Sequence, residues 1–249
     1  MTRRVLVTGA SRGIGRTIAR AFAEAGDTVA VHYGSNVAAA EETLVSLPGR
    51  GHLTVQADMA DADAVREAVD GAAEGLGGLD VLVNNAGVFL AHPPLETSYE
   101  AWQTAWARTI ATNLTGAANA TFCALPHLRA AGGGAVVNVT SRGAFRGEPN
   151  NPAYGASKAG LNAFTQSMAV ALAPHDIRVA AVAPGFVQTE MAREVLDGPG
   201  GDAVRAQSPF GRVAAPEEVA AAVLWLTSEG ARFSSGTIID VNGASYLRS

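Results

Sequence analysis

The stretch Thr8-Gly9-Ala10-Ser11-Arg12-Gly13-Ile14-Gly15 lies between a short apolar run, Val5–Val7, and an Ala-rich segment that reaches about Ala25. A strand, a glycine-rich turn and a helix in this order let the backbone pass close to a pyrophosphate. Glycines lack the β-carbon that would keep a phosphate away, and the N–H groups at the start of the helix attract it. The turn therefore predicts a dinucleotide site, although the glycines could instead only make a tight turn.

The rest of the chain alternates short β-rich runs with Ala-rich segments of helical length. Continuous apolar runs are typical of strands buried on both faces of a parallel sheet, and right-handed crossovers place helices on both of those faces. The sequence thus predicts an α/β, doubly wound Rossmann fold with a parallel sheet of about seven strands. The predicted strands are Val5–Val7, Val29–Tyr33, Leu53–Gln56, Val81–Val83, Ala135–Val139, Val179–Val182 and Thr237–Val241.

Length and composition favour one domain over residues 1–249. The 249 residues are 48% hydrophobic and 16% charged, which suits one large α/β unit, and no interdomain linker is visible. The Gly- and Pro-containing stretch from Pro184 to Pro209 is the one long segment predicted to be irregular. Such a stretch is often a mobile active-site cover, so we expect a substrate lid at about 186–210.

Charge and cysteine content exclude several classes of protein. The net charge is −5 and the basic residues are scattered, which predicts no nucleic-acid partner. The single cysteine, Cys123, rules out an internal disulfide and suits a reducing cytoplasm. The uncharged stretch from Thr109 to Leu128 is interrupted by polar residues and Pro126, so we expect a buried helix and no membrane anchor. The apolar run after the first arginines is too short for a secretory signal, and we expect a cytoplasmic protein.

The end of the second predicted strand bears on the choice of dinucleotide. The segment Tyr33-Gly34-Ser35-Asn36 carries no acid, whereas a carboxylate here would repel a 2′-phosphate. Arg12, Ser35 and Asn36 could hold that phosphate by hydrogen bonds. We therefore predict NADPH/NADP+ in preference to NADH/NAD+. The alternative is that Arg12 lies in solvent and Ser35 caps the next helix.

Tyr154 and Lys158 are four residues apart in a run that is typical of a helix, so their side chains share one face. Lys158 is the only lysine in a chain whose other basic residues, apart from histidine, are all arginine. A neighbouring ammonium favours the phenolate, which predicts a lowered pKa and a tyrosine able to act as acid and base. Most pairs with this spacing are merely surface neighbours.

Polar residues also follow two other predicted strands. Ser141 lies just beyond Ala135–Val139, where open α/β sheets bind ligands, and its hydroxyl could donate to a substrate carbonyl or merely cap a turn. Asn84-Asn85-Ala86-Gly87 follows Val81–Val83, and its small residues permit close approach of a ligand. Asn113, on the preceding long helix, would alone be read as an exposed amide.

Together these motifs resemble the short-chain dehydrogenase/reductase family over almost the whole chain, nearest to the 3-oxoacyl-(acyl carrier protein) reductase-like group. The resemblance implies that Tyr154 transfers a proton to or from the substrate oxygen, and that Lys158 lowers the pKa of Tyr154 and binds the nicotinamide ribose. It also implies that Ser141 polarises the substrate carbonyl and that Asn113 holds a water in a proton relay. No metal site is expected. The expected cofactor contacts are Gly9, Ser11, Arg12, Gly13, Ile14, Gly15, Tyr33, Ser35, Asn36, Asp58, Met59, Asn85, Ala86, Gly87, Tyr154, Lys158, Pro184, Gly185, Val187 and Thr189.

The expected reaction is NADP(H)-dependent hydride transfer that interconverts a ketone and a secondary alcohol. The substrate could be a 3-oxoacyl thioester or another small carbonyl compound. The predicted walls hold Arg142, Arg146 and Arg193, which could accept an anionic carrier or simply be solvated. The resemblance also implies a homotetramer built partly on the helices that carry Tyr154 and Asn113.

Two other functions stay open. A noncatalytic dinucleotide-binding sensor would keep the glycine turn but would not need Asn113, Ser141, Tyr154 and Lys158. An epimerase or dehydratase would use the same Tyr and Lys, but such enzymes normally carry a longer C-terminal region for a nucleotide-sugar.

Overall fold

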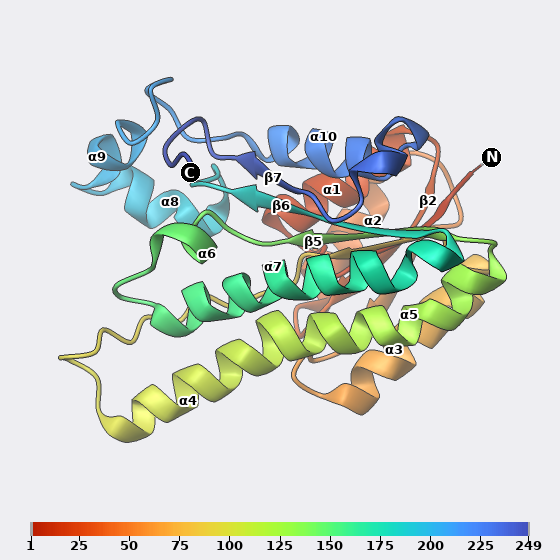
Figure 1. The fold of residues 1–249 in the computed structure, drawn as a ribbon, viewed down its shortest axis with the longest axis horizontal. Helices are drawn as coiled ribbons and strands as arrows, with labels where there is room; N and C mark the ends of the chain where they lie inside the picture. Colours follow the sequence, from red (N-terminus) through yellow and green to blue (C-terminus); the bar gives the residue numbers. More distant parts are fainter. Residues whose placement is uncertain (1, 249) are drawn as a thin grey trace.

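The structure is a computed structural model that describes residues 2–248, apart from the side chains of Met191 and Glu194. Its centre is one sheet of seven strands, all paired in parallel, in the order β3-β2-β1-β4-β5-β6-β7 (Figure 1). The sheet confirms the predicted architecture, and every predicted strand overlaps an observed one. The strands are β1 Arg4–Val7, β2 Thr28–Tyr33, β3 Leu53–Gln56, β4 Val81–Asn84, β5 Gly134–Val139, β6 Ile177–Pro184 and β7 Ile238–Val241.

Helices cover both faces of the sheet (Figure 1). One layer contains α1 and α10 and packs on the core cluster that includes Phe22 and Val223. The other layer contains α3, α5 and α7 and packs on the cluster that includes Leu79 and Leu128. The helices are α1 Gly13–Glu24, α2 Val37–Ser46, α3 Ala62–Leu76, α4 Tyr99–Ile110, α5 Gly116–Ala130, α6 Gly143–Arg146, α7 Pro152–Leu172, α8 Glu190–Asp197, α9 Gly201–Arg205 and α10 Pro216–Leu226.

Side chains cap the starts of α3 and α10. Asp61 precedes α3, and its Oδ1 accepts hydrogen bonds from the backbone N–H groups of Asp63 and Ala64. Helix α10 begins at Pro216, and the carboxylate of Glu218 accepts from the backbone N–H of Ala215 at 2.8 Å. Such caps satisfy N–H groups that the first turn of a helix leaves unpaired.

The stretch from Pro184 to Pro209 is not irregular throughout, so that prediction is wrong in part. It contains α8 and α9, and Figure 1 shows them standing apart from the sheet at one end of the molecule. Helix α8 forms because Thr189 Oγ1 accepts from the N–H of Ala192 at 3.3 Å and Glu190 places a negative charge in the first turn. The glycines and prolines separate the two helices and do not prevent them.

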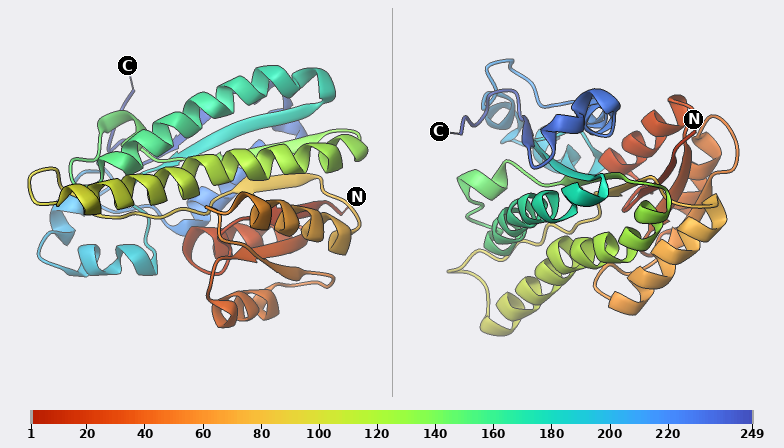
Figure 2. Two further views of the ribbon diagram at one scale, coloured as in Figure 1. Left: turned by 90° about the horizontal axis from the view of Figure 1, so that it is seen from below. Right: turned by 45° about the vertical axis from the view of Figure 1, so that its right-hand side comes forward.

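A π-helical turn, Ala111–Thr115, joins α4 to α5. The three segments form one long helix that lies beside α7 in the left view of Figure 2. Turns of this kind occur frequently at functional sites because they shift the side chains that follow. Here the π-helical turn contains Asn113.

The strand order places β1 between β2 and β4, so the chain leaves neighbouring strands toward opposite faces of the sheet. A crevice opens at the carboxyl ends of strands at such a switch point, and ligands bind there in open α/β sheets. Among the described helices, none is long and apolar enough to cross a bilayer.

Candidate functional site at the carboxyl edge of the sheet

The two turns that follow β1 and β4 are held together by Thr8 and Asn85. The amide Nδ2 of Asn85 donates to the carbonyls of Thr8 and Gly9 at 2.9 and 3.1 Å. In return, Thr8 Oγ1 accepts from the N–H groups of Asn85 and Ala86 at 2.9 and 3.0 Å. The two predicted turns therefore form one rigid unit at the switch point.

Close packing explains two of the glycines. Gly9 has a φ of +64°, and a β-carbon there would lie 2.8 Å from the Cα of Ala86. A β-carbon at Gly15 would collide with the carbonyl of Gly9 and the amide of Asn85. Gly13 has a φ of +54° and faces the methyl group of Thr189. Glycine is required at the first two positions because no side chain fits, and at the third because the backbone is left-handed.

His32 connects the glycine turn to the end of β3. Its Nδ1 accepts from the N–H of Gly9 at 2.9 Å, so its Nε2 carries the proton and donates to the carbonyl of Ala57 at 3.1 Å. Burial lowers the pKa of His32 to about 4, and the ring is neutral at physiological pH. His32 thus fixes the tautomer and the position of the first glycine.

The start of α1 is free to bind an anion. Arg12 occupies the position before the helix with no side-chain cap, and no acidic residue lies in the first turn. The first N–H groups of a helix have no partner within it, so those of Gly13, Ile14 and Gly15 can receive a phosphate. Arg12 is exposed and makes no ion pair among the described residues. Ser11 lies in the same turn, where its carbonyl accepts from Arg16 Nη2 at 2.8 Å.

The residues at the end of β2 have different surroundings. Tyr33 is buried, and its hydroxyl is directed to Gln56 Oε1 at 3.4 Å. Asn36, and not Ser35, caps the next helix, because Asn36 Oδ1 accepts from the N–H of Ala39 at 3.0 Å. Ser35 is exposed. Arg12 and Ser35 are therefore the side chains available to an anion here.

Asp58 and Met59, predicted to flank an adenine, follow β3. Asp58 forms an ion pair with Arg108 of α4 at 2.7 Å, and this contact lowers the pKa of the Asp58 carboxyl group. Met59 is buried, and its carbonyl lies directly against Gly116 at the start of α5. The site edge is thus tied to the long helix that carries Asn113.

The segment after β6 closes the other side of the crevice. Pro184 accepts the N–H of Arg142 at 2.8 Å, and Gly185 donates to the carbonyl of Val241 at 3.0 Å. Val187 is buried and forms an isolated parallel bridge with Ala214. Thr189 then reaches Gly13, so this segment comes back to the glycine turn.

Tyr154 and Lys158 lie on one face of α7. The Lys158 ammonium lies 5.7 Å from the centroid of the Tyr154 ring and donates to the carbonyl of Val139 at 2.8 Å. Phe89 packs edge-on against Tyr154 at 4.8 Å between ring centroids. Ser141 lies beside the phenol, and its Oγ accepts from the N–H of Gly143 at 3.0 Å.

The predicted lowering of the tyrosine pKa is wrong for this structure. Burial raises the pKa of Tyr154 to about 12, and a hydrogen bond with Ser141 opposes that rise only in part, while the charge of Glu148 adds to it. Burial also lowers the pKa of Lys158 to about 8. Desolvation is the largest cause for both groups because burial removes water from their charged forms. The phenol is therefore protonated at neutral pH.

Asn113 is fully buried and contacts the chain between β4 and α4. Its Oδ1 accepts from the N–H of Val88 at 2.8 Å, and its Nδ2 donates to the carbonyl of Val88 at 3.0 Å and to Ser157 Oγ at 3.2 Å. A β-carbon at Gly87 would lie 3.2 Å from Asn113 Oδ1 and 3.6 Å from Lys158 Nζ. The Asn113 amide and the Lys158 ammonium thus both lie next to the backbone of Gly87.

His92 fixes the start of α7. Its ring donates from Nδ1 to the carbonyl of Leu90 at 2.7 Å and accepts at Nε2 from the N–H of Ala153 at 3.1 Å. The ring is almost fully buried, at 1% exposure. His92 therefore joins the loop after β4 to the residue that precedes Tyr154.

Sequence reasoning missed Thr8, His32 and His92 as contributors to the site. Thr8 was quoted in the glycine motif, and its place at the end of a strand was the available signal. The two histidines had no such signal because their partners lie far along the chain, 23 residues away for Gly9 and 61 for Ala153.

Comparisons with known proteins agree with this geometry. Residues 9–244 match the family model described as enoyl-(acyl carrier protein) reductase. The chain is 42% identical to the cis-4-hydroxycyclohexanecarboxylate dehydrogenase of Sinomonas cyclohexanicum over 96% of this chain and 94% of that protein. It is 36% identical to a 3-oxoacyl-(acyl-carrier-protein) reductase of Staphylococcus aureus over 99% of both chains.

A solved short-chain dehydrogenase of Burkholderia cenocepacia, in complex with NADP, superimposes with a TM-score of 0.87 and 34% identity over 98% of this chain and 97% of that one. The fold and site define a dinucleotide-dependent oxidoreductase class. The chain belongs to the short-chain dehydrogenase/reductase family.

Proposed function

We propose that this protein is an NADP(H)-dependent oxidoreductase that interconverts a ketone and a secondary alcohol, with Tyr154 as the general acid and base. One observation carries the proposal. The Lys158 ammonium lies 5.7 Å from the centre of the Tyr154 ring, and the same ammonium faces Gly87 beside the glycine turn. The phenol of Tyr154, the proposed proton donor, therefore lies beside the proposed dinucleotide site.

The residues present fit the dinucleotide. The uncapped start of α1 offers free N–H groups to the pyrophosphate, and Thr8 with Asn85 keeps the turn rigid. Asp58 and Met59 would flank the adenine. Asn85, Ala86 and Gly87 would line the middle of the cofactor, Lys158 would bind the nicotinamide ribose, and the segment from Pro184 to Thr189 would hold the carboxamide.

When bound, the nicotinamide would supply the hydride for reduction of the carbonyl carbon. The Ser141 hydroxyl donates to the carbonyl oxygen and orients it. Tyr154, which is protonated at neutral pH, transfers its proton to that oxygen and completes the alcohol. The Lys158 ammonium stabilises the phenolate left behind until solvent returns a proton. Asn113 positions the loop at Val88 and would hold a water of the relay.

The choice of NADP(H) is supported by Arg12 and Ser35, which are available where a 2′-phosphate would lie, and by the absence of an acid at the end of β2. The solved Burkholderia relative is in complex with NADP. The relatives' names differ in substrate, a hydroxycyclohexanecarboxylate and a 3-oxoacyl carrier protein, but share the hydroxyl or oxo group. A small carbonyl compound, including a 3-oxoacyl thioester, is therefore the proposed substrate class.

Further parts of the proposal concern the lid, the assembly and the compartment. The segment 186–210, with α8 and α9, would cover the substrate within a single domain of residues 1–249.

Exposed apolar side chains on the helices of the second layer, Phe122 of α5 and Val170 of α7, support a homotetramer built on these helices. Light scattering tests it, because a monomeric mass contradicts the assembly. The single cysteine, Cys123, supports a cytoplasmic location.

The decisive experiment is Tyr154→Phe with a panel of ketones and 3-oxoacyl thioesters. The variant should lose turnover, followed by nicotinamide absorbance, while NADPH binding measured by fluorescence is retained. Tyr99→Phe, on an exposed residue at the start of α4, is the control and should keep turnover. Retained turnover in Tyr154→Phe would remove its role, and a wild-type chain that binds NADPH but turns over no carbonyl compound would favour the noncatalytic sensor.

A further inference from the structure

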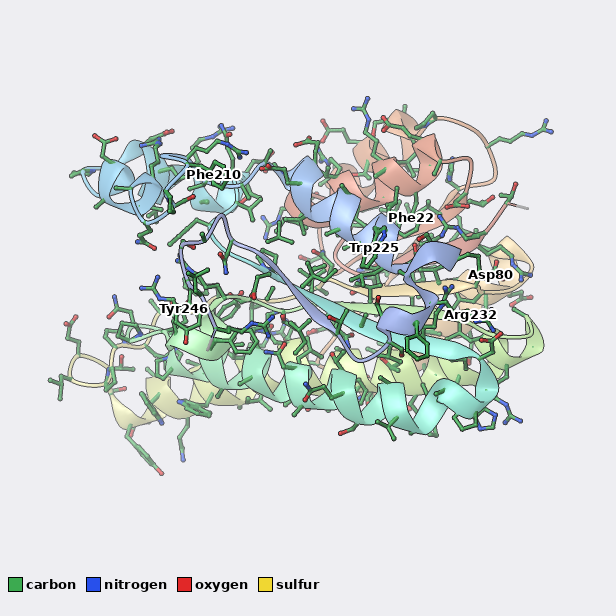
Figure 3. All side chains as sticks on the ribbon, turned by 45° about the horizontal axis from the view of Figure 1, so that its top comes forward. Phe22, Asp80, Phe210, Trp225, Arg232 and Tyr246 are labelled. Carbon is green, nitrogen blue, oxygen red and sulfur yellow. The ribbon has the colours of Figure 1, made fainter. Side chains whose placement is uncertain are left out.

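A cavity of about 270 Å³ lies between the lid segment and the C-terminal tail. In Figure 3, Phe210 of the lid and Tyr246 of the tail lie at the same end of the molecule, away from Asp80 and Arg232. The cavity begins one residue beyond Ser141, at Arg142. Its walls include Arg142, Phe186, Ser208, Phe210, Asn242 and Ser245.

Arg142 is a buried cation in the wall of this cavity, with only 5% of its surface exposed. Its Nη1 donates to Ser245 Oγ, and its guanidinium stacks over the Phe186 ring at 5.4 Å from the centroid. Nε and Nη2 donate to no protein group within the described part of the chain. One interpretation of the three predicted wall arginines was that they are simply solvated. Arg146 and Arg193 are exposed, in agreement with it, whereas Arg142 is buried and contradicts it.

The other charged side chains of the cavity are already paired. Arg212 binds Glu218 at 2.7 Å, and Asp240 binds Arg248 at 2.7 Å. Arg142 has no ion-pair partner among the residues that the structure describes. Burial lowers the pKa of Arg142, the charge of Arg146 lowers it further, and the charge of Glu148 opposes this lowering only in part. Buried charges in proteins are normally paired, so this guanidinium is prepared for an anion from outside the chain.

We propose that Arg142 binds a carboxylate of the substrate itself, so that the natural substrate is a compact oxo acid or hydroxy acid. This inference rests on the proposed function. Arg142 follows Ser141 directly in the chain, and its guanidinium stacks on Phe186, which lies between the expected cofactor contacts Gly185 and Val187. A substrate with its carbonyl at Ser141 would therefore extend its carboxylate toward Arg142. The planar fork of arginine matches a carboxylate with two parallel hydrogen bonds. A single free guanidinium suits one negative charge better than the two of a phosphate.

The first test compares a rigid oxo acid, 4-oxocyclohexanecarboxylate, with its methyl ester in the presence of NADPH. For the wild type, kcat/KM should be higher for the acid by about tenfold or more, the usual effect of a charge-assisted hydrogen bond. In Arg142→Gln this ratio should collapse toward one, mainly through KM of the acid. Arg66→Gln on α3 is the control, because this arginine is exposed and pairs with Asp63 at the surface, and it should keep the wild-type ratio.

A second variant protects the test against a folding defect in Arg142→Gln. Ser245→Asp would place a carboxylate beside Nη1 of Arg142 and compete with that of the substrate, whereas Ser245→Asn has a similar shape without the charge. KM for the acid should rise about tenfold or more in Ser245→Asp relative to Ser245→Asn. An equal KM in the two variants would overturn the proposal.

A non-reacting probe separates this inference from the proposed function. Cyclohexanecarboxylate binding to the NADP+-saturated protein is measured by calorimetry for the wild type, Arg142→Gln and Arg66→Gln. Binding that is lost only in Arg142→Gln supports the carboxylate subsite even if no ketone is reduced. Absence of binding, or binding that does not depend on Arg142, overturns the subsite even if neutral ketones are reduced, in which case the proposed function stands alone.

Discussion

The side chain of Asn113 holds both polar groups of the Val88 backbone, accepting from its N–H at 2.8 Å and donating to its carbonyl at 3.0 Å. The amide thereby acts as a strand partner for one residue of a loop. Asn113 lies in the π-helical turn. This turn therefore fixes the loop at Val88 and, through it, the position of Gly87 beside Lys158.

Replacing Asn113 with Leu should therefore damage both stability and catalysis. Each lost hydrogen bond costs about 1 kcal/mol, and more where a group stays buried without a partner, so we expect the free energy of unfolding to fall by about 2 kcal/mol or more. A loop displaced at Gly87 should lower kcat by about tenfold or more. Urea unfolding and steady-state kinetics measure the two effects. Unchanged kcat in a folded Asn113→Leu variant would show that the amide does not position the site.

The pKa of Lys158 predicts an alkaline limit to ketone reduction. Its pKa is lowered to about 8, so above that pH the ammonium loses its proton and no longer stabilises the Tyr154 phenolate. The Tyr154 phenol stays protonated over this range because its pKa is about 12. A decline in the reduction rate above about pH 8 would therefore come from the deprotonation of Lys158. We expect kcat/KM for reduction to decline above about pH 8.

The matched variant for this profile is Lys158→Arg, because a guanidinium does not titrate in the same range. It should be slower than the wild type at pH 7 but should lack the decline. A wild-type rate that stays level to about pH 10 would contradict the assignment.

His32 predicts a loss of stability in mild acid. Its pKa is lowered from 6.5 in the unfolded chain to about 4 in the fold, so the unfolded chain takes up a proton first as the pH falls. The free energy of unfolding should therefore decrease between pH 6.5 and 4, by about 3 kcal/mol in total from this group. His32→Gln, which does not titrate, should show a weaker dependence on pH in urea unfolding.

Carboxyl groups titrate in the same acid range, so the comparison of His32→Gln with the wild type isolates the histidine. His127→Gln serves as the control, because His127 lies in a surface pair with Asp70. Parallel curves for all three proteins would mean that His32 is not the source of the acid sensitivity.

Arg12 predicts the strength of the preference for the phosphorylated cofactor. A charge-assisted hydrogen bond contributes about 1.5 to 3 kcal/mol, so Arg12→Ala should lower kcat/KM with NADPH by about 10- to 100-fold and affect NADH much less. Arg20→Ala, an exposed arginine paired with Glu24 on the same helix, is the control and should change neither value. A wild type that prefers NADH would refute the cofactor assignment outright.

The strands and the glycine turn could be predicted because their signals are local. Apolar runs such as Ala135–Val139 and the order strand, glycine turn, helix are visible within a few residues, and the observed bounds follow them closely. Helix α8 was missed because the glycines and prolines of its neighbourhood outweighed the Thr189 cap. The pKa of Tyr154 was misjudged for another reason: spacing shows which groups are neighbours, but burial, which dominates here, depends on the whole fold.

Two histidines escaped prediction for the same physical reason. His32 and His92 act by hydrogen bonds to backbone groups that are remote in the chain, and only the folded structure brings these partners together.

The hydrogen bond from the Ala153 N–H to His92 couples the loop at Leu90 to the first turn of α7, which carries Tyr154. If this loop moves outward, the His92 ring must either lose its hydrogen bond to Ala153 or displace the first turn of α7. A substitution that moves this loop would then also displace the residue before Tyr154, without touching the phenol itself.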